Sequence, residues 1–233
     1  MTRLLTHHAV YGLDLGQTGD PSALTLLTAV ESIHSPHTWY DPTHPRHRHW
    51  LLSDARIFPL GMAYRQLAQQ IHAHMLAFLA SHPQTPITLV ADAPGLGRPP
   101  LEILHAELAP TAHLAGIVFT GGQSHSQSQH PTLPVTIEAI PKLDLIQNLI
   151  HSIESRQLHL TPGLPLRDEL REQFRSLRYT NNTHTGHTGI TVAPGSSHPH
   201  HADLVMALSL ATWRLRHLFP QAPNPLPQRL PGF

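Results

Sequence analysis

The sequence predicts an α/β fold: a mixed central sheet, with an antiparallel meander followed by parallel strands, flanked by helices. Two observations lead to this prediction. Three apolar runs fit for strands follow one another before residue 60, and beyond it helical periodicity alternates with short apolar runs. A length of 233 residues suits one domain of ordinary size. We therefore assign residues 1–218 to one domain and residues 219–233, which are rich in proline, to a C-terminal tail.

The first part of the chain reads as an antiparallel meander. Strands are predicted over 10–14 and 22–30, and the short Gly- and Asp-containing turn between them favours a hairpin. A weakly alternating run over 50–58 supplies the third strand. Between them, residues 33–48 are rich in His and Pro and predict an irregular loop.

The remainder alternates between helices and strands. Apolar residues at three- and four-residue spacing predict the helices, and short apolar runs predict buried strands. The predicted elements are helix 62–80, strand 87–91, helix 101–108, strand 114–119, strand 135–139, a helix opening at Pro141, helix 166–178 and helix 202–218. The polar segment 121–132 predicts a mobile loop, and the turn-rich segment 181–189 is flanked by possible short strands.

Composition excludes several classes of protein. The chain has 15 basic and 15 acidic residues, so no strong global field steers it towards nucleic acid. It has 22 histidines and no cysteine, which excludes disulfides and thiolate metal sites. Its N-terminus is too short in its apolar part for a secretory signal and it has no long apolar window, so we expect a soluble intracellular protein with no membrane partner. The absence of a P-loop motif predicts no motor in these residues.

Three carboxylates stand out from the other acidic residues. Asp14 and Asp92 each end an apolar strand, and Asp203 lies in the first turn of an almost entirely apolar helix. If the two strands are neighbours, all three carboxylates meet at one sheet edge, where they repel unless a divalent cation neutralises them. Oxygen ligands suit Mg²⁺ or Mn²⁺. A single Asp at a strand end is more often a turn former or helix cap than a ligand, and Asp203 alone would suit the helix dipole. Asp20, before a proline, is a turn residue or an assisting ligand.

Four motifs in order resemble the nuclease domain of phage terminase large subunits, an RNase H-like domain. An apolar strand carrying G-x-D is followed by D-P-[ST]-A; an Asp is followed by small residues and G-x-G; a lysine opens a helix; and H-x-D-L precedes an Ala/Leu helix. The matching segments are 12–14 (GLD), 20–23 (DPSA), 92–97 (DAPGLG), 140–145 (IPKLDL) and 201–204 (HADL). The resemblance spans about residues 10–216.

The resemblance implies a two-metal endonuclease that cleaves double-stranded DNA with two Mg²⁺ or Mn²⁺ ions. Asp14 would bridge the ions, and Asp92 and Asp203 would each hold one side. His201 would orient a ligand, or simply start the helix. Lys142, the only lysine, would position the scissile phosphate, or be an ordinary surface residue.

DNA binding requires cations, since phosphate neutralisation supplies most non-specific affinity. A stripe on the predicted helix 166–178 is one candidate surface: Arg167, Arg171, Arg175 and Arg178. Interleaved acids at 168, 169 and 172 leave a solvated, salt-bridged face as the alternative. Arg46 and Arg48 form a second candidate.

The chain departs from the family pattern in two respects. Ala202 stands where the family often has a second acid after the histidine, which could alter a second metal site. The family's ATPase motor is missing from this sequence, which is then an isolated nuclease domain, a split terminase subunit or a relative with another purpose. As a terminase subunit it would have a separate terminase ATPase, small subunit or portal protein as partner. It also implies the cytoplasm of a bacterial host, with a phage or prophage as the source.

Two other readings stay open. A non-enzymatic, histidine-rich metal-binding or packaging accessory protein would bind Zn²⁺ or Ni²⁺ through scattered histidines. Its candidate ligands are His184, His187, His198, His200 and His201. A resolvase-like, structure-selective nuclease would keep the fold, although the fourth acid usual on its last helix is not obvious here.

Overall fold

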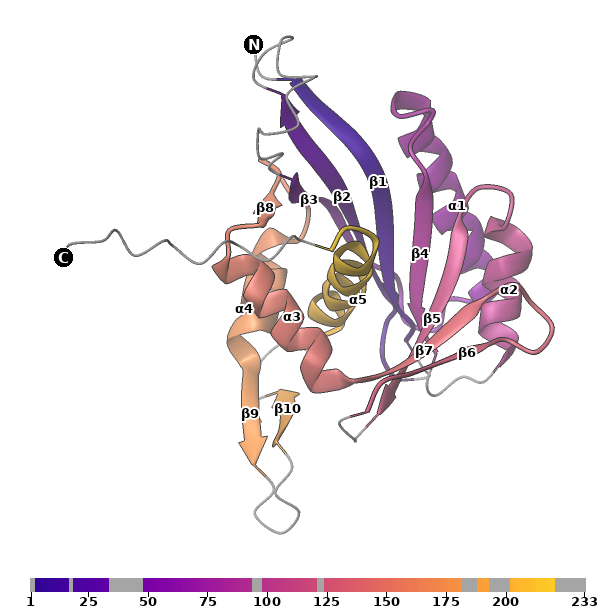
Figure 1. Cartoon of the computed structure of the whole chain (residues 1–233). Helices are drawn as coiled ribbons and strands as arrows, with labels where there is room; N and C mark the ends of the chain where they lie inside the picture. The colour runs from indigo at the N-terminus through magenta and orange to yellow at the C-terminus, as the bar shows by residue number, and fades with distance from the viewer. Residues whose placement is uncertain are drawn as a thin grey trace.

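The computed structural model describes residues 3–16, 19–33, 48–93, 98–120, 124–181, 188–192 and 202–220. An eight-stranded mixed sheet forms its centre, in the order β6-β7-β5-β4-β1-β2-β3-β8 (Figure 1). The strands of this sheet are β1 (Arg3–Asp14), β2 (Ala23–Ile33), β3 (Arg48–Ile57), β4 (Ile87–Asp92), β5 (His113–Thr120), β6 (Ser126–Gln129), β7 (Thr136–Pro141) and β8 (Leu158–Leu160). The predicted mixed α/β sheet is confirmed.

The sheet has an antiparallel half and a parallel half, as predicted. Strands β1, β2 and β3 form the antiparallel meander, and β4, β5 and β7 continue from β1 in parallel. Five helices and a separate antiparallel pair complete the described part of the chain. These elements are α1 (Tyr64–Ser81), α2 (Arg98–Leu108), α3 (Lys142–Glu154), α4 (Arg167–Ser176), α5 (Asp203–Leu218), and the pair β9 (Leu177–Asn181) and β10 (Thr188–Val192).

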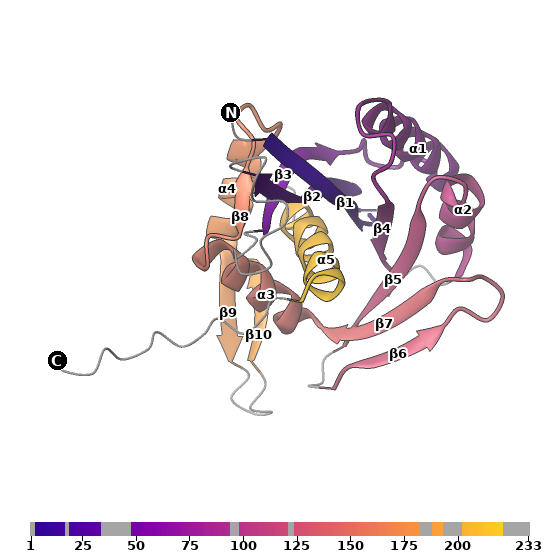
Figure 2. The ribbon, with the colours of Figure 1, turned by 45° about the horizontal axis from the view of Figure 1, so that its top comes forward.

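Helices cover both faces of the sheet, which gives two cores (Figure 2). On one face α5 packs on β1, β2 and β4, with α3 and α4 against it. On the other face α1 and α2 pack over a second set of apolar side chains that includes Tyr11, Leu89 and Met75. Helix α5 is buried on nearly all sides, as its almost continuous apolar sequence predicts. None of the described helices has the length and apolar character needed to cross a membrane.

Three details of the prediction were wrong. The predicted mobile loop 121–132 contains β6, whose four polar residues are all exposed and show no alternation; pairing with β7 alone defines the strand. The three-residue strand β8, parallel to β3, gives too short a pattern to detect. The helix predicted over 166–178 ends at Ser176, where Leu177 turns extended and starts β9. The loop was predicted over 33–48, but its end residues belong to β2 and β3; residues 34–47 and the tail beyond 220 lie outside the described residues.

Candidate active site

The parallel pairing of β1 with β4 places two aspartates side by side. Gly12 is the register partner of Val90, and Leu13 is the partner of Ala91. The next residue on each strand is Asp14 or Asp92, and each ends its strand. Both carboxyl groups therefore lie at the same edge of the sheet.

Helix α5 brings the third carboxylate to the same sheet edge. A Cβ added at Gly12 would stand 1.9 Å from the backbone oxygen of Ala207, so only glycine allows α5 to lie this close to β1. Asp203 is one helical turn before Ala207 and faces the same side. Asp14 lies two residues beyond Gly12, on the same face of its strand. We call Asp14, Asp92 and Asp203 the carboxylate site.

A tight turn follows Asp14 and holds Asp20 near it. The backbone N–H of Gly16 donates to the Ser22 hydroxyl at 3.0 Å, and the Tyr64 hydroxyl of α1 donates to the Gly16 carbonyl, also at 3.0 Å. A Cβ at Gly16 would collide with the Asp20 carbonyl at 2.1 Å. The sequence motif includes Ser22, and the structure shows what it does: its side chain holds the turn.

The electrostatics show how closely these groups gather. Burial raises the pKa of Asp14 well above its usual range, and the nearby charges of Asp92, Asp203 and Asp20 raise it further. Burial also raises the pKa of Asp92 to about 7. The Lys142 ammonium opposes both shifts. The structure therefore brings together the predicted ligands and the predicted lysine.

The donors at this edge suit a divalent cation. Asp203 is only 6% exposed, and the Asp92 Oδ1 atom is buried without a hydrogen-bond partner among the described residues. Buried carboxylate oxygens that repel one another gain most from a hard cation. Within the described ranges, no three His, Asp or Glu side chains lie close enough together to coordinate one ion. The donor type fits Mg²⁺ or Mn²⁺, and ion binding would require the carboxylates to draw closer.

The predicted arginine stripe lies on α4, where local ion pairs already engage part of it. Arg171 pairs with Asp168 at 2.9 Å, and Arg175 pairs with Glu172 at 2.6 Å. Arg178 donates to the carbonyls of residues 175 and 177 at the end of the helix. All four stripe arginines are exposed, Arg167 included. Their contact with DNA stays a prediction.

Other predicted residues fall elsewhere. The guanidinium of Arg48 lies over the Phe219 ring, 5.0 Å from its centroid, which ties this arginine to the end of α5. His201 and Arg46 lie outside the described residues, as do the candidate zinc ligands at 184, 187, 198 and 200. Ala202 is buried and has a left-handed backbone, with φ 73°.

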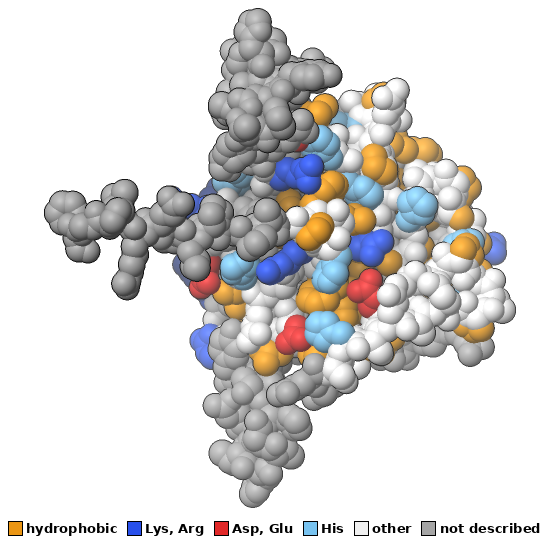
Figure 3. All heavy atoms as spheres, in the orientation of Figure 1, with side chains coloured by type: hydrophobic (Ala, Val, Ile, Leu, Met, Phe, Trp, Pro, Cys, Tyr) orange, Lys and Arg blue, Asp and Glu red, His pale blue; other side chains and the backbone are white. Residues whose placement is uncertain are grey.

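On the face seen in Figure 3, basic, acidic and histidine side chains are interspersed, in keeping with the net charge of zero.

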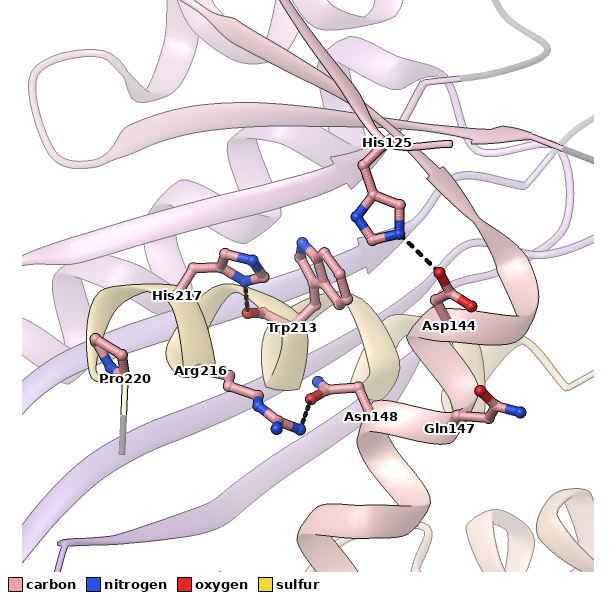
Figure 4. Close-up of a pocket in the computed structure, with 8 residues that line it drawn as sticks. All are labelled: His125, Asp144, Gln147, Asn148, Trp213, Arg216, His217 and Pro220. Carbon is pink, nitrogen blue, oxygen red and sulfur yellow. Dashed lines mark hydrogen bonds and ion pairs between the residues drawn. The ribbon is translucent and has the colours of Figure 1, made fainter. Parts of the chain in front are cut away.

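A cleft of about 650 Å³ lies between α3 and the end of α5 (Figure 4). Its polar groups largely pair with one another. His125 contacts Asp144 at 2.7 Å, and Arg216 donates to Asn148 at 2.7 Å. The carboxylate site does not line this cleft, so we do not assign the cleft to catalysis.

Comparison with solved structures identifies the fold. The human cytomegalovirus terminase nuclease domain soaked with manganese aligns at a TM-score of 0.54, with 14% identity over 88% of this chain and 81% of that domain. A second structure of this domain gives the same TM-score and identity over 88% and 84%. The chain has an RNase H-like fold.

Other comparisons add nothing to this fold assignment. A Thermus thermophilus RuvC structure aligns at a TM-score of only 0.35, with 12% identity over 90% of this chain and 94% of RuvC, too loosely to support an argument. No known protein family model matches the sequence, and neither does any curated protein. At this identity the terminase likeness establishes the RNase H-like fold alone.

The raised pKa of Asp92 predicts how pH acts on the stability of the metal-free protein. Asp92 has a raised pKa when folded, so its contribution to stability is fully present below the unfolded value near 4 and is lost by about pH 7. Asp92→Asn removes this loss. We expect the difference in free energy of unfolding, variant minus wild type, to rise by on the order of 1–2 kcal/mol from pH 5 to pH 8.

Urea denaturation of both proteins in EDTA measures this difference. Any effect of pH that both proteins share cancels in the comparison. A difference that stays constant from pH 5 to pH 8 would show that the pKa of Asp92 is not raised in the folded protein.

Proposed function

We propose that this chain is a divalent-metal-dependent endonuclease that cleaves double-stranded DNA by two-metal phosphodiester hydrolysis. One observation carries the proposal: three aspartates from β1, β4 and α5 gather at one sheet edge, where they raise the pKa of Asp14. The RNase H-like fold shared with a terminase nuclease domain supports the proposal, and so does the manganese soak of one of those structures.

Each residue of the site has a proposed role. Asp14, whose pKa is raised by burial and then by the charges of Asp92 and Asp203, would bridge two ions, and Asp92 and Asp203 would hold one ion each. Bound Mg²⁺ or Mn²⁺ would supply an activated water and stabilise the leaving oxygen. The Lys142 ammonium, already close to two carboxylates, would neutralise the scissile phosphate. His201 would orient a ligand, and Asp20 would assist from the turn.

The exposed face of α4 is the proposed DNA contact. A phosphate contact would take the arginines from their local ion pairs, which as exposed pairs contribute only about 0–1 kcal/mol each. In Arg171→Gln/Arg175→Gln we expect weaker duplex binding, with the slope of log affinity against log salt reduced by about 2. Fluorescence anisotropy with a labelled duplex in EDTA measures this slope.

Arg65→Gln supplies the matched control for this measurement. Arg65 is an exposed arginine on α1, which covers the opposite face of the sheet from α4. An unchanged slope in the double variant would assign the stripe to a solvated, salt-bridged face. A reduced slope for Arg65→Gln would show that DNA contacts the face covered by α1.

Cleavage of supercoiled plasmid tests the proposed activity. Purified protein with Mg²⁺ or Mn²⁺ should yield nicked and linear products, and EDTA should stop the reaction. Plasmid left intact with either ion would rule out the activity. The histidine-rich accessory alternative instead expects tight Zn²⁺ binding that Asp14→Ala leaves unchanged, which a zinc titration measures.

A role in DNA packaging is a further part of the proposal. Packaging needs a P-loop ATPase motor, and we propose that a separate terminase ATPase supplies it, acting with a small subunit or portal protein. Such an assembly would act in the cytoplasm of a bacterial host. Co-purification with the product of a neighbouring P-loop gene would identify this partner.

A further inference from the structure

Helix α5 begins without the usual local cap. Its N-cap residue is Ala202, which has no side-chain hydrogen-bonding group and holds a left-handed backbone conformation. The first backbone N–H groups of a helix need acceptors from outside the helix, and Ser, Thr, Asp or Asn at the N-cap normally supply one. Here another helix supplies the acceptor.

The side chain of Gln173 in α4 caps the N-terminus of α5. Its Oε1 atom accepts from the backbone N–H of Leu204 at 2.9 Å and from that of Val205 at 3.4 Å. Its Nε2 atom donates to the Glu169 carboxylate at 3.2 Å. Because two N–H donors face one end of the amide and a carboxylate faces the other, its orientation is fixed. The Gln173 side chain is 1% exposed, so water cannot replace it.

We propose that Gln173 is a positioning residue for the carboxylate site, holding the first turn of α5 so that Asp203 faces Asp14. The proposal rests on the proposed metal-dependent function. Asp203 is the residue directly before Leu204, whose N–H makes the shorter of the two bonds. Loss of the acceptor frees the first turn, and with it the Asp203 side chain that a cation must draw towards Asp14.

Helix α4, which carries Gln173, also carries the arginine stripe on its exposed side. Leu170 and Gln173 are the buried residues of α4, while the four stripe arginines are exposed. The helix proposed to contact DNA therefore also holds a proposed metal ligand. No local sequence pattern marks Gln173, because it caps a helix that begins much further along the chain, where Leu204 lies 31 residues beyond Gln173.

Manganese binding tests the proposal without relying on cleavage. Gln173→Met keeps the length of the side chain and removes its acceptor. We expect Mn²⁺ affinity, measured by electron paramagnetic resonance of free Mn²⁺, to fall about tenfold or more, as for the loss of other groups that orient a metal ligand. In the Asp203→Asn background the same change should have no further effect.

Two further variants separate positioning from general stability. Asn148→Ala removes a buried polar side chain from the cleft; it should lower the melting temperature without changing Mn²⁺ affinity. Glu169→Gln/Gln173→Glu exchanges the two partners, keeps the net charge and restores an acceptor facing α5. We expect this swap to regain Mn²⁺ affinity relative to Gln173→Met.

The outcomes distinguish this inference from the proposed function. If the wild type binds no Mn²⁺, the proposed function fails. If the wild type binds Mn²⁺ and Gln173→Met binds it equally well, only the positioning role is overturned. Equal losses in Gln173→Met and Asn148→Ala, with no recovery in the swap, would also overturn it. If Gln173→Met does not fold, the swap decides alone: affinity near that of the wild type supports the role, and a tenfold loss contradicts it.

Discussion

Asp14→Asn should reduce metal-dependent plasmid cleavage to background, a loss of about a thousandfold or more, equivalent to about 4 kcal/mol of transition-state stabilisation. Burial raises the pKa of Asp14, and the charges of both Asp92 and Asp203 raise it further, so Asp14 lies near both of the other proposed ligands. The amide keeps the shape of the side chain and removes its charge. Cleavage rates with saturating Mn²⁺ measure the effect.

The matched control for this change is Asp144→Asn. Asp144 lies two residues beyond Lys142 and pairs with exposed His125, yet it lines the cleft and not the carboxylate site. Cleavage by Asp144→Asn should stay within about twofold of the wild type. Because Asp14→Asn also relieves repulsion between carboxylates, its melting temperature in EDTA should equal or exceed that of the wild type. Cleavage by Asp14→Asn at the wild-type rate would refute the assignment of Asp14.

Gly12→Ala should destabilise the fold by about 3 kcal/mol or more, at the upper end for overpacking. The added Cβ would stand 1.9 Å from the Ala207 carbonyl oxygen, a backbone atom that cannot rotate away. Helix α5 would have to move off β1, carrying Asp203 with it. Urea denaturation measures the loss, and Mn²⁺ affinity should fall together with stability.

Gly19→Ala is the control for the glycine change itself. A Cβ at Gly19 meets no atom within 4 Å, so this substitution should change stability by less than about 1 kcal/mol. If the two variants are equally stable, α5 does not rest on β1 as closely as described.

The sequence predicted the sheet and the position of the carboxylate site for one physical reason. Buried strands leave long apolar runs, and a carboxylate at the end of such a run is conspicuous. Asp14 and Asp92 could be found this way, and the nearly all-apolar sequence of α5 marked Asp203 as a buried acid. That they bind metal stays a prediction.

Other features left no local pattern. Strand β6 is polar and exposed on both faces, so only its pairing with β7 reveals it. The hydroxyl of Tyr64 reaches the turn carbonyl of Gly16 from a helix 48 residues away. Gln173 reads as one polar residue among many on an amphipathic helix until α5 is seen against it. Contacts of this kind depend on tertiary packing, which the periodicity and spacing of a sequence do not reveal.

The central claim is that Asp14, Asp92 and Asp203 together hold divalent cations. A Mn²⁺ titration followed by electron paramagnetic resonance, on the wild type and on the three single Asp→Asn variants, tests it most directly. We predict that the wild type binds up to two ions, that each variant loses at least one, and that Asp144→Asn binds like the wild type. Binding that is absent in the wild type, or unchanged in all three variants, would contradict the account.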